Sequence, residues 1–223
     1  MFRRRQPLVQ EQGRQTLSIQ FDTPEQQTES YIVGMWTFLV TEIMFFGAVF
    51  AIYLVYRVAN HDVFYLAHLK LDIPLGFFNT LVLLTSSLTM ALTVHFAQRG
   101  DARKQLLFLL VTMALACTFL VVKGFEYHHK YVEGLIPGPN FRFEPVEHLR
   151  VAQLFFSLYF AMTGLHALHV AIGVLVMAIM AVLIAIRHPS VQDFVPVEMV
   201  GLYWHFVDIV WIFLFPLLYL IPR

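Results

Sequence analysis

Five long apolar stretches dominate this sequence and restrict what it can fold into. A helix needs about 20 mostly apolar residues to cross about 30 Å of hydrocarbon. Five stretches reach that length: Tyr31 to Tyr56, Leu75 to Gln98, Leu106 to Tyr127, Val151 to Arg187 and Val197 to Leu220. Composition agrees, since 58% of the 223 residues are apolar and 13% are charged, whereas a soluble domain has about 25% charged residues. The sequence therefore predicts an all-α membrane protein, a bundle of five transmembrane helices.

The apolar pattern also predicts the domain organisation. Residues 31–223 form one five-helix membrane domain, and the polar segment Met1 to Ser30 forms a tail outside it. The fourth stretch holds about 37 residues, which as one helix would be roughly 55 Å long. That length exceeds the hydrocarbon thickness, so this helix must tilt strongly or project into water.

Basic residues predict which way the chain crosses the membrane. With the N-terminus in the cytoplasm, eight basic residues fall on the cytoplasmic side and six on the other side. The clearest local group, Arg99, Arg103 and Lys104, lies in the short connection between the second and third stretches. The positive-inside rule therefore favours a cytoplasmic N-terminus and an external C-terminus.

Charge and cysteine content exclude several classes of protein. The 15 basic residues balance the 15 acidic ones, and no basic run extends beyond Arg3, Arg4 and Arg5, so nucleic acid is not an expected partner. The single cysteine, Cys117, cannot form an internal disulfide or a cysteine-based metal site.

Two glutamates lie inside predicted helices, where an ionisable group costs about 2.5–3.5 kcal/mol at the helix centre and suggests a function. Glu42 lies near the middle of the first helix and has no obvious partner within it. We expect a protonated carboxyl packed against another helix, with direct proton handling as the alternative. Glu126 has Lys123 three residues before it and Lys130 four after it. Those spacings face one another on a helix and predict an ion pair that reaches the membrane surface.

The fifth helix carries a third intramembrane carboxylate. Asp208 lies one helical turn after His205, so we expect a structural hydrogen bond between these two side chains, with proton handling as the alternative. Trp204 and Trp211 share a face with Asp208 and are expected to be core or lipid-facing aromatic residues.

Three histidines raise the question of haem or metal binding. His166 and His169 lie on the fourth helix, and His205 lies on the fifth. The pair His169 and His205, near Gly164 and Gly173, could in principle supply two axial ligands and room for a macrocycle. Nothing repeats this pair, although a two-haem electron path needs four histidines at two depths. We therefore expect hydrogen-bonded core histidines and no metal.

Five segments, one in each predicted helix, resemble subunit III of the haem-copper oxidases, the cytochrome c oxidase family. Thr41 to Phe46 is similar to the family's Ser-Glu-x-Met-Phe-Phe, and Gly164 to Val170 with Gly173 is similar to its Gly-x-His-x-x-His-Val-x-x-Gly. The other three are Asn79 to Ser87 with Thr89, the pair Glu126 and Tyr127, and Tyr203 to Trp211. Because the five occur in order, the chain is identified as a member of this family.

The resemblance implies a role that composition could not indicate. It implies an accessory, non-catalytic subunit of a proton-pumping cytochrome c oxidase, which reduces oxygen to water in a bacterial inner membrane. The expected partners are subunits I and II, which carry the haems and copper, together with phospholipids held in a cleft, and a larger respiratory supercomplex is a further candidate. Glu42 corresponds to a carbodiimide-reactive carboxyl that supports proton uptake. Structural or lipid-contact roles are implied for Glu126, His166, His169, Trp204, His205, Asp208 and Trp211.

Two departures from the family pattern leave alternatives open. Many members have seven helices, and the first two are missing here, so the lipid cleft is either open or filled by another subunit. Many members also have Gln where Lys123 stands, and the Lys variant occurs in branches that include subunits associated with nitric oxide reductase. A quinol oxidase or nitric oxide reductase subunit is therefore the alternative function. An independent haem-bearing electron carrier or a transporter is a more remote one.

Overall fold

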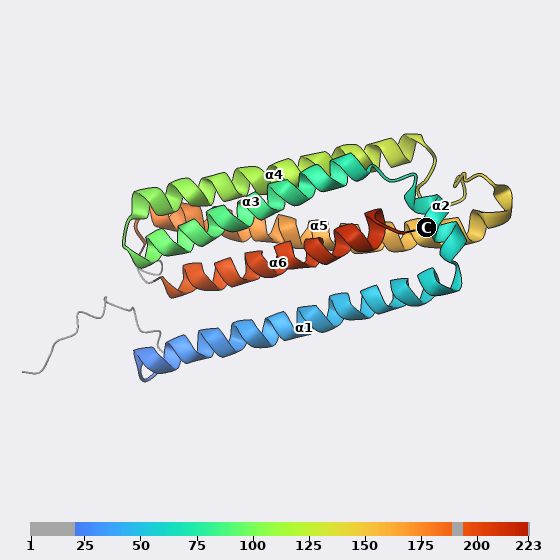
Figure 1. The fold of residues 1–223 in the computed structure, drawn as a ribbon. Coiled ribbons are helices and arrows are strands. Elements are labelled where there is room, and N and C mark those ends of the chain that lie inside the picture. The colour runs from blue at the N-terminus through green and yellow to red at the C-terminus, as the bar shows by residue number, and fades with distance from the viewer. Residues whose placement is uncertain (1–20, 189–193, 223) are drawn as a thin grey trace, which may run out of the picture.

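The computed structural model describes residues 21–188 and 194–222, within which every regular element is a helix (Figure 1). The elements are α1 (Pro24–Ala59), α2 (His61–His68), α3 (Ile73–Gln98), α4 (Ala102–Val132), the short 3-10 helix η1 (Val146–His148), α5 (Leu149–Ala185) and α6 (Val195–Tyr219). Five of these helices, α1, α3, α4, α5 and α6, are long and apolar enough to cross a membrane. The prediction of five transmembrane helices is confirmed.

α1 is longer than its apolar pattern predicts, and most of the difference lies at its N-terminus. The Thr23 hydroxyl accepts a hydrogen bond from the backbone N–H of Gln26 at 3.2 Å, and Pro24 follows in the first turn, where a missing N–H costs nothing. The predicted helix start at Tyr31 is therefore wrong, because polar residues continue the helix beyond its apolar part. Residues 1–20 of the predicted tail lie outside the described residues.

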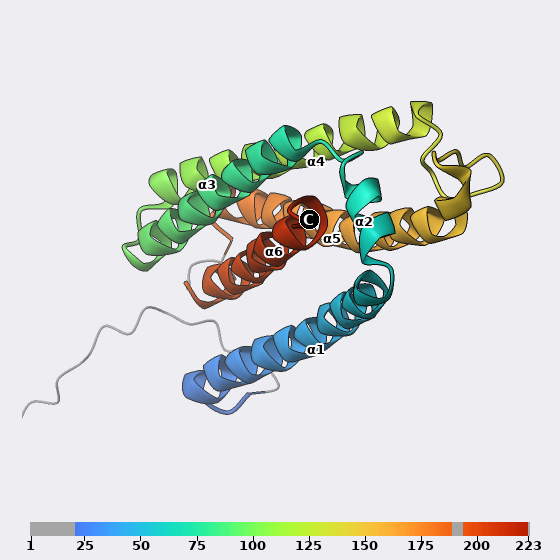
Figure 2. The same ribbon diagram turned by 45° about the vertical axis from the view of Figure 1, so that its right-hand side comes forward.

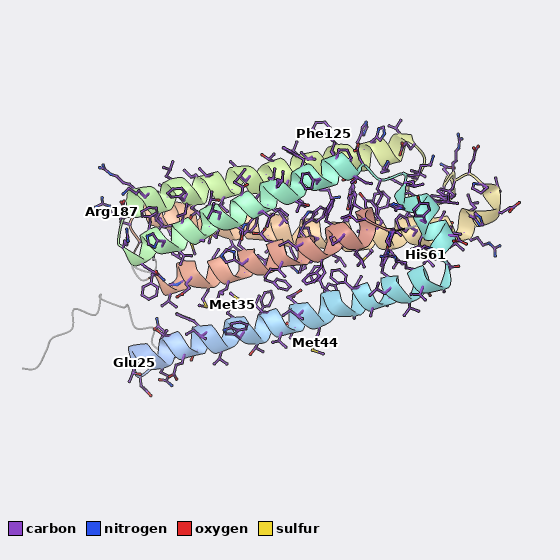
Figure 3. All side chains as sticks on the ribbon, viewed as in Figure 1. Glu25, Met35, Met44, His61, Phe125 and Arg187 are labelled. Atoms are coloured by element: carbon purple, nitrogen blue, oxygen red, sulfur yellow. The ribbon has the colours of Figure 1, made fainter. Side chains whose placement is uncertain are left out.

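The four helices α3, α4, α5 and α6 form a bundle, and α1 lies apart from it along most of its length (Figures 1 and 2). In the most apolar 18 residues of α1, 17% are buried, against 56% in α6. Figure 3 shows Met35 pointing toward the bundle and Met44 pointing away from it, and Met44 is 70% exposed. We call α1 the arm, since only one of its faces packs on the rest of the chain.

The arm joins the bundle near the end of α1, through the short helix α2. The ring of Phe64 in α2 is buried against Tyr53 of the arm at 5.5 Å and Phe155 of α5 at 5.2 Å between ring centroids. The Tyr53 hydroxyl donates to the carbonyl of Leu217 in α6 at 3.0 Å, and Arg57 donates to the same oxygen at 3.4 Å. The sequence did not predict α2, because eight residues are too few to show a helical period above their surroundings.

α5 is a single helix of 37 residues, the length that its apolar run predicts. It begins two residues earlier than predicted. It also ends two residues earlier, because Arg187 adopts a left-handed conformation with φ 52° and cannot continue the helix. In Figure 1 the first turns of α5 extend beyond the end of α6 and pass beside α2. The projecting part of this long helix is thus where the arm is attached.

The two ends of the bundle carry different elements. The start of α1, the α3–α4 turn, the end of α5 and the start of α6 lie at one end, and α2 and the C-terminus lie at the other (Figure 1). Because five is an odd number of crossings, the start of α1 and the C-terminus lie at opposite ends of the bundle.

Candidate functional site

The first intramembrane site joins the arm to the bundle. Oε2 of Glu42 lies 3.1 Å from Nε2 of His169 in α5. The other ring nitrogen of His169 lies 2.8 Å from the Leu165 carbonyl oxygen, and the Tyr203 hydroxyl of α6 donates to the His169 carbonyl at 2.9 Å. The Phe46 ring packs 5.2 Å from the imidazole between ring centroids. We call the Glu42–His169 contact the bridge, and it confirms that Glu42 packs against another helix.

Hydrogen-bonding rules fix how many protons the bridge holds. A carbonyl oxygen only accepts hydrogen bonds, so Nδ1 of His169 must carry a hydrogen toward Leu165. The second nitrogen then either accepts from a protonated Glu42 or, as an imidazolium, donates to a Glu42 carboxylate. Both forms have no net charge and share one proton between two residues. The bridge can therefore hold a proton at membrane depth without burying a net charge.

An apolar groove runs between the arm and α6 and has a volume of about 420 Å³. Apart from the rings of Trp36 and His205, its walls are aliphatic or phenyl side chains. They include Leu39, Ile43, Phe46 and Phe50 from the arm and Leu202, Phe206, Ile209 and Phe213 from α6. Phe46 belongs both to this wall and to the surroundings of His169, so the bridge adjoins the groove. The shape and chemistry suit a hydrocarbon chain.

The second intramembrane site is a buried ion pair inside the bundle. Nζ of Lys123 lies 2.9 Å from Glu126 Oε2 and donates to the Tyr219 hydroxyl at 2.7 Å. Tyr159 donates to the other Glu126 oxygen at 2.8 Å, and Tyr219 donates to that same oxygen at 2.5 Å. The ammonium also lies 4.8 Å from the centroid of the Trp211 ring, a distance suited to a cation–π contact. We call this group from α4, α5 and α6 the Lys123 cage.

The cage corrects the predicted surface ion pair. The predicted contact between Lys123 and Glu126 is present, but the two side chains are only 3% and 1% exposed, so the pair does not reach the membrane surface. Lys130 instead pairs with Glu133 at 2.6 Å. Tyrosine hydroxyls from two other helices supply the hydrogen bonds that water would give at a surface.

The seam between α3 and α6 is held by hydrogen bonds between α3 hydroxyls and α6 rings. The pairs are Trp204 with Ser86 at 3.1 Å, Trp211 with Thr80 at 3.1 Å, and His205 with Ser87 at 2.7 Å. Trp204 and Trp211 were predicted to be core or lipid-facing aromatic residues, and the structure places both in the core, since both are fully buried. Each indole N–H has a partner, as a buried tryptophan requires.

The predicted hydrogen bond between His205 and Asp208 is wrong. The Nδ1 atom of His205 is bonded to Ser87 on the neighbouring helix. Neither side-chain oxygen of Asp208 has a hydrogen-bond partner among residues 21–188 and 194–222, although the residue is 2% exposed. The one-turn spacing allowed the contact, and packing against α3 replaced it.

The histidines do not assemble into a haem site. The ring of His166 packs 5.5 Å from Phe119 and 5.1 Å from Trp211, and neither of its nitrogens has a hydrogen-bond partner within the described part of the chain. It is a core residue as predicted, but the predicted hydrogen bond is wrong. The space beside Gly173 is filled by an indole, because a Cβ there would lie 2.8 Å from Trp204. Glycine makes room for tryptophan here, which contradicts the hypothesis of a macrocycle.

No group of three or more His, Cys, Asp or Glu side chains suited to a metal ion occurs in the described ranges. That the chain carries no metal or haem stays a prediction from the resemblance.

Comparisons with known proteins agree with this architecture. The family model described as Cytochrome c oxidase subunit III matches residues 147–222. The chain is 30% identical to the Cytochrome c oxidase subunit 3 of Thermostichus vulcanus, with 98% of this chain and 99% of the relative covered. It is 31% identical to the Cytochrome bo(3) ubiquinol oxidase subunit 3 of Pseudomonas aeruginosa, with 85% and 84% covered. It is 35% identical to the Cytochrome c oxidase subunit 3 of Corynebacterium diphtheriae, with 85% and 87% covered. The chain belongs to the subunit III family of haem-copper oxidases.

As a subunit III, this multi-pass membrane protein is a component of a haem-copper oxidase complex, an oxidoreductase of the respiratory chain. The resemblance predicted from five sequence fragments is confirmed. The part that the family model matches holds α5 and α6, which supply one side of the bridge, two tyrosines of the cage and all the rings of the seam. The structural or lipid-contact roles of the individual residues stay predictions.

Several contact residues of this subunit III were not predicted. Tyr159 and Tyr219 complete the cage, and Ser87 binds His205, although nothing local marks them. His169 was predicted to be a hydrogen-bonded core histidine, but its partner was not predicted, because its contact with Glu42 spans 127 positions of the chain. The available signal was that Ser87 and His169 each lie within a segment that resembles the family.

Proposed function

We propose that this chain is the accessory subunit III of a proton-pumping cytochrome c oxidase, bound to subunits I and II in a bacterial inner membrane. Its N-terminus is cytoplasmic and its C-terminus periplasmic, as the positive-inside rule favours. Cytochrome c as electron donor is supported by the relative from Thermostichus vulcanus, which matches along almost its full length, and by the 35% identity to the Corynebacterium diphtheriae protein. A quinol oxidase is the second candidate, because the Pseudomonas aeruginosa relative is a ubiquinol oxidase subunit.

The bridge carries the proposal for what the subunit does. Glu42 and His169 share a proton, are 19% and 13% exposed, and lie where the largely exposed arm meets the bundle. The outward face of the arm is the proposed contact with subunit I, and the bridge supports rapid proton delivery there without taking part in oxygen chemistry. Haems and copper belong to the partner subunits. A phospholipid chain in the apolar groove would cover its walls and hold the arm in place.

The donor is tested on the native complex, purified with this chain in it. We expect turnover with reduced cytochrome c that exceeds turnover with a quinol, together with copper in the binuclear centre of subunit I. Turnover with a quinol alone would favour the second candidate. A centre with iron in place of copper would indicate a nitric oxide reductase and contradict both.

The role of the bridge is tested by Glu42→Gln, which keeps the shape and a hydrogen-bonding group but removes ionisation. We expect the variant to assemble, to reduce oxygen at more than about half the normal rate, and to lose carbodiimide labelling, with faster inactivation during turnover. Glu25→Gln, in the first turn of the same helix, is the matched control. A fall of about 100-fold in an assembled complex, or roughly 2.7 kcal/mol in the barrier, would instead place Glu42 on an obligatory proton path.

A further inference from the structure

Asp208 is a buried carboxyl group that neither the bridge nor the cage uses. It is 2% exposed, and both of its side-chain oxygens lack a hydrogen-bond partner within residues 21–188 and 194–222. The Lys123 ammonium does not balance it, because Lys123 is already paired with Glu126. A lone carboxylate would therefore be an uncompensated charge inside a membrane bundle, which is costly. We expect the neutral acid, whose O–H needs an acceptor.

The seam between α3 and α6 leaves one hydroxyl for this acid. The two helices lie side by side (Figures 1 and 2). The indoles on either side of Asp208 along α6 already use two α3 hydroxyls as acceptors. The hydroxyl of Ser87 interacts with Asp208, although no well-aligned hydrogen bond joins them. Ser87 is thus the α3 group to which Asp208 can donate.

Ser87 also contacts the histidine that spacing alone had paired with Asp208. Its Oγ lies 2.7 Å from Nδ1 of His205. A hydroxyl has one hydrogen to donate and can accept as well, so Ser87 can donate to His205 while it accepts from the Asp208 acid. The acid and the imidazole are therefore linked through a hydroxyl of another helix.

His205 forms the outer end of this chain of groups. Its ring lines the apolar groove beside the arm, and the residue is half-buried, whereas Asp208 is buried. The other ring nitrogen, Nε2, makes no hydrogen bond within the described part of the chain. No second bond thus holds the ring against Ser87, and a half-buried ring has room to turn.

We propose that Asp208, Ser87 and His205 form a proton relay, which stores a proton at the α3–α6 seam and exchanges it at the wall of the groove. The carboxyl proton passes to Ser87 Oγ as the hydroxyl proton passes to Nδ1 of His205. This step leaves a carboxylate and an imidazolium, so the net charge does not change. The ring then turns toward the groove, where the Nδ1 proton is exchanged. The relay uses residues of this chain alone and depends neither on the electron donor nor on the role of the bridge.

The test follows the carboxyl C=O band of Asp208 by infrared spectroscopy while the purified complex is transferred from H₂O to D₂O. The band is assigned by its loss in Asp208→Asn. We expect it to shift on transfer in the unaltered complex. The shift should slow about tenfold or more in Ser87→Ala and in His205→Gln, because each variant removes one step of the relay. Ser87→Thr keeps the hydroxyl and should keep the normal rate.

Ser86→Ala is the matched control. Ser86 precedes Ser87 on α3, is fully buried and accepts a hydrogen bond from Trp204, but it is not a member of the relay. This variant should therefore exchange at the normal rate. The amide band in the same spectra checks the helical structure of each variant, and the presence of all subunits checks its assembly.

Three results would overturn the proposal. If the unaltered complex has no band that Asp208→Asn removes, Asp208 is ionised and stores no proton. If Ser87→Ala or His205→Gln exchanges at the normal rate, the proton takes another route. If Ser86→Ala changes the rate as much as Ser87→Ala does, the effect comes from altered packing of the seam.

Discussion

Glu42 and Glu126 both lie in membrane-spanning helices, and each faces a side chain that can carry a positive charge, yet their surroundings differ. Glu126 is 1% exposed, is paired with Lys123 and accepts hydrogen bonds from two tyrosines. Glu42 is 19% exposed, and among the described residues its carboxyl group has one hydrogen-bond partner, His169. The first lies inside the bundle, and the second lies where the arm touches it.

The difference separates a fixed charge from an exchangeable proton. A fully buried ion pair is tolerated only when every donor and acceptor is satisfied, and removing one member leaves a stranded charge. A fully buried ion pair holds helices in register, and contact with water would not help it to do so. A partly exposed pair that shares one proton can release that proton or take it up again. The cage therefore suits structure, and the bridge suits proton supply.

The largest effect is expected when the cage loses its carboxylate. Glu126→Gln leaves the Lys123 ammonium without a counter-charge and should destabilise the bundle by about 3–5 kcal/mol. Thermal unfolding of the purified complex, monitored by loss of this subunit, measures the change. The double variant Lys123→Gln with Glu126→Gln should recover much of the loss, because no charge is then buried. If the single variant is as stable as the unaltered protein, the pair is not structural.

A smaller effect is expected from replacing a glycine in the bundle, whereas replacing a glycine in the arm should cost nothing. A Cβ at Gly173 would lie 2.8 Å from Trp204, whereas a Cβ at Gly47 would meet nothing within 4 Å. Gly173→Ala should therefore cost about 1–3 kcal/mol through overpacking. Gly47→Ala, the matched control, should be neutral or up to about 1 kcal/mol stabilising, because alanine favours helix. Equal melting temperatures for the two variants would contradict the packing described for the α5–α6 contact.

A still smaller effect is expected at the bridge. His169→Gln removes the partner of a partly exposed group, so the stability should fall by about 1 kcal/mol or less. If Glu42 is the member that holds the proton, carbodiimide labelling should persist in this variant, since the neutral carboxyl is the reactive form. Mass spectrometry of the labelled peptide checks this. If the unaltered protein is not labelled and labelling appears only in this variant, Glu42 is the charged member of an ion pair.

The smallest effect concerns the attachment of the arm at α2. Burial lowers the pKa of His68 below its ordinary value of 6.5, so the docked helix favours the neutral ring. As the pH falls through 6.5, the His68 ring takes up a proton more readily when α2 is undocked than when it is docked. Protonation therefore weakens the docking of α2. Once corrected for the pH dependence of the intrinsic exchange rate, the protection of the α2 amides against hydrogen exchange should therefore fall as the pH is lowered from about 7.5 to about 5. His68→Gln should remove this dependence, and an unchanged dependence would assign it to another group.

Local patterns predicted much of the fold. Apolar length predicted five crossings and the 37 residues of α5, and a three-residue spacing predicted the contact between Lys123 and Glu126. These features depend on neighbours within one helix, where geometry is known in advance. The resemblance added the order of the motifs and the family.

Contacts between distant helices were beyond local patterns. The partner of Glu42 is 127 positions away, and the Tyr219 hydroxyl is 96 positions from Lys123. Pairing these residues requires knowing which helices are neighbours and at what depth. The hydrogen bond expected between His205 and Asp208 shows that local spacing can also mislead. The spacing permits that contact, but His205 bonds to Ser87 of another helix instead.

The hydrogen bond from the arm to the Leu217 carbonyl of α6 has a consequence for how the chain assembles during its synthesis. The oxygen of Leu217 lies in the last turn of its helix, where no intrahelical N–H reaches it, and in lipid it needs a donor. Tyr53 supplies that donor across 164 positions. Ribosomes add about 5–20 residues per second, so roughly 8–33 s pass between the two. The first helix to enter the bilayer therefore gains this contact only when the last one arrives, and a chain that stops before Leu217 lacks it.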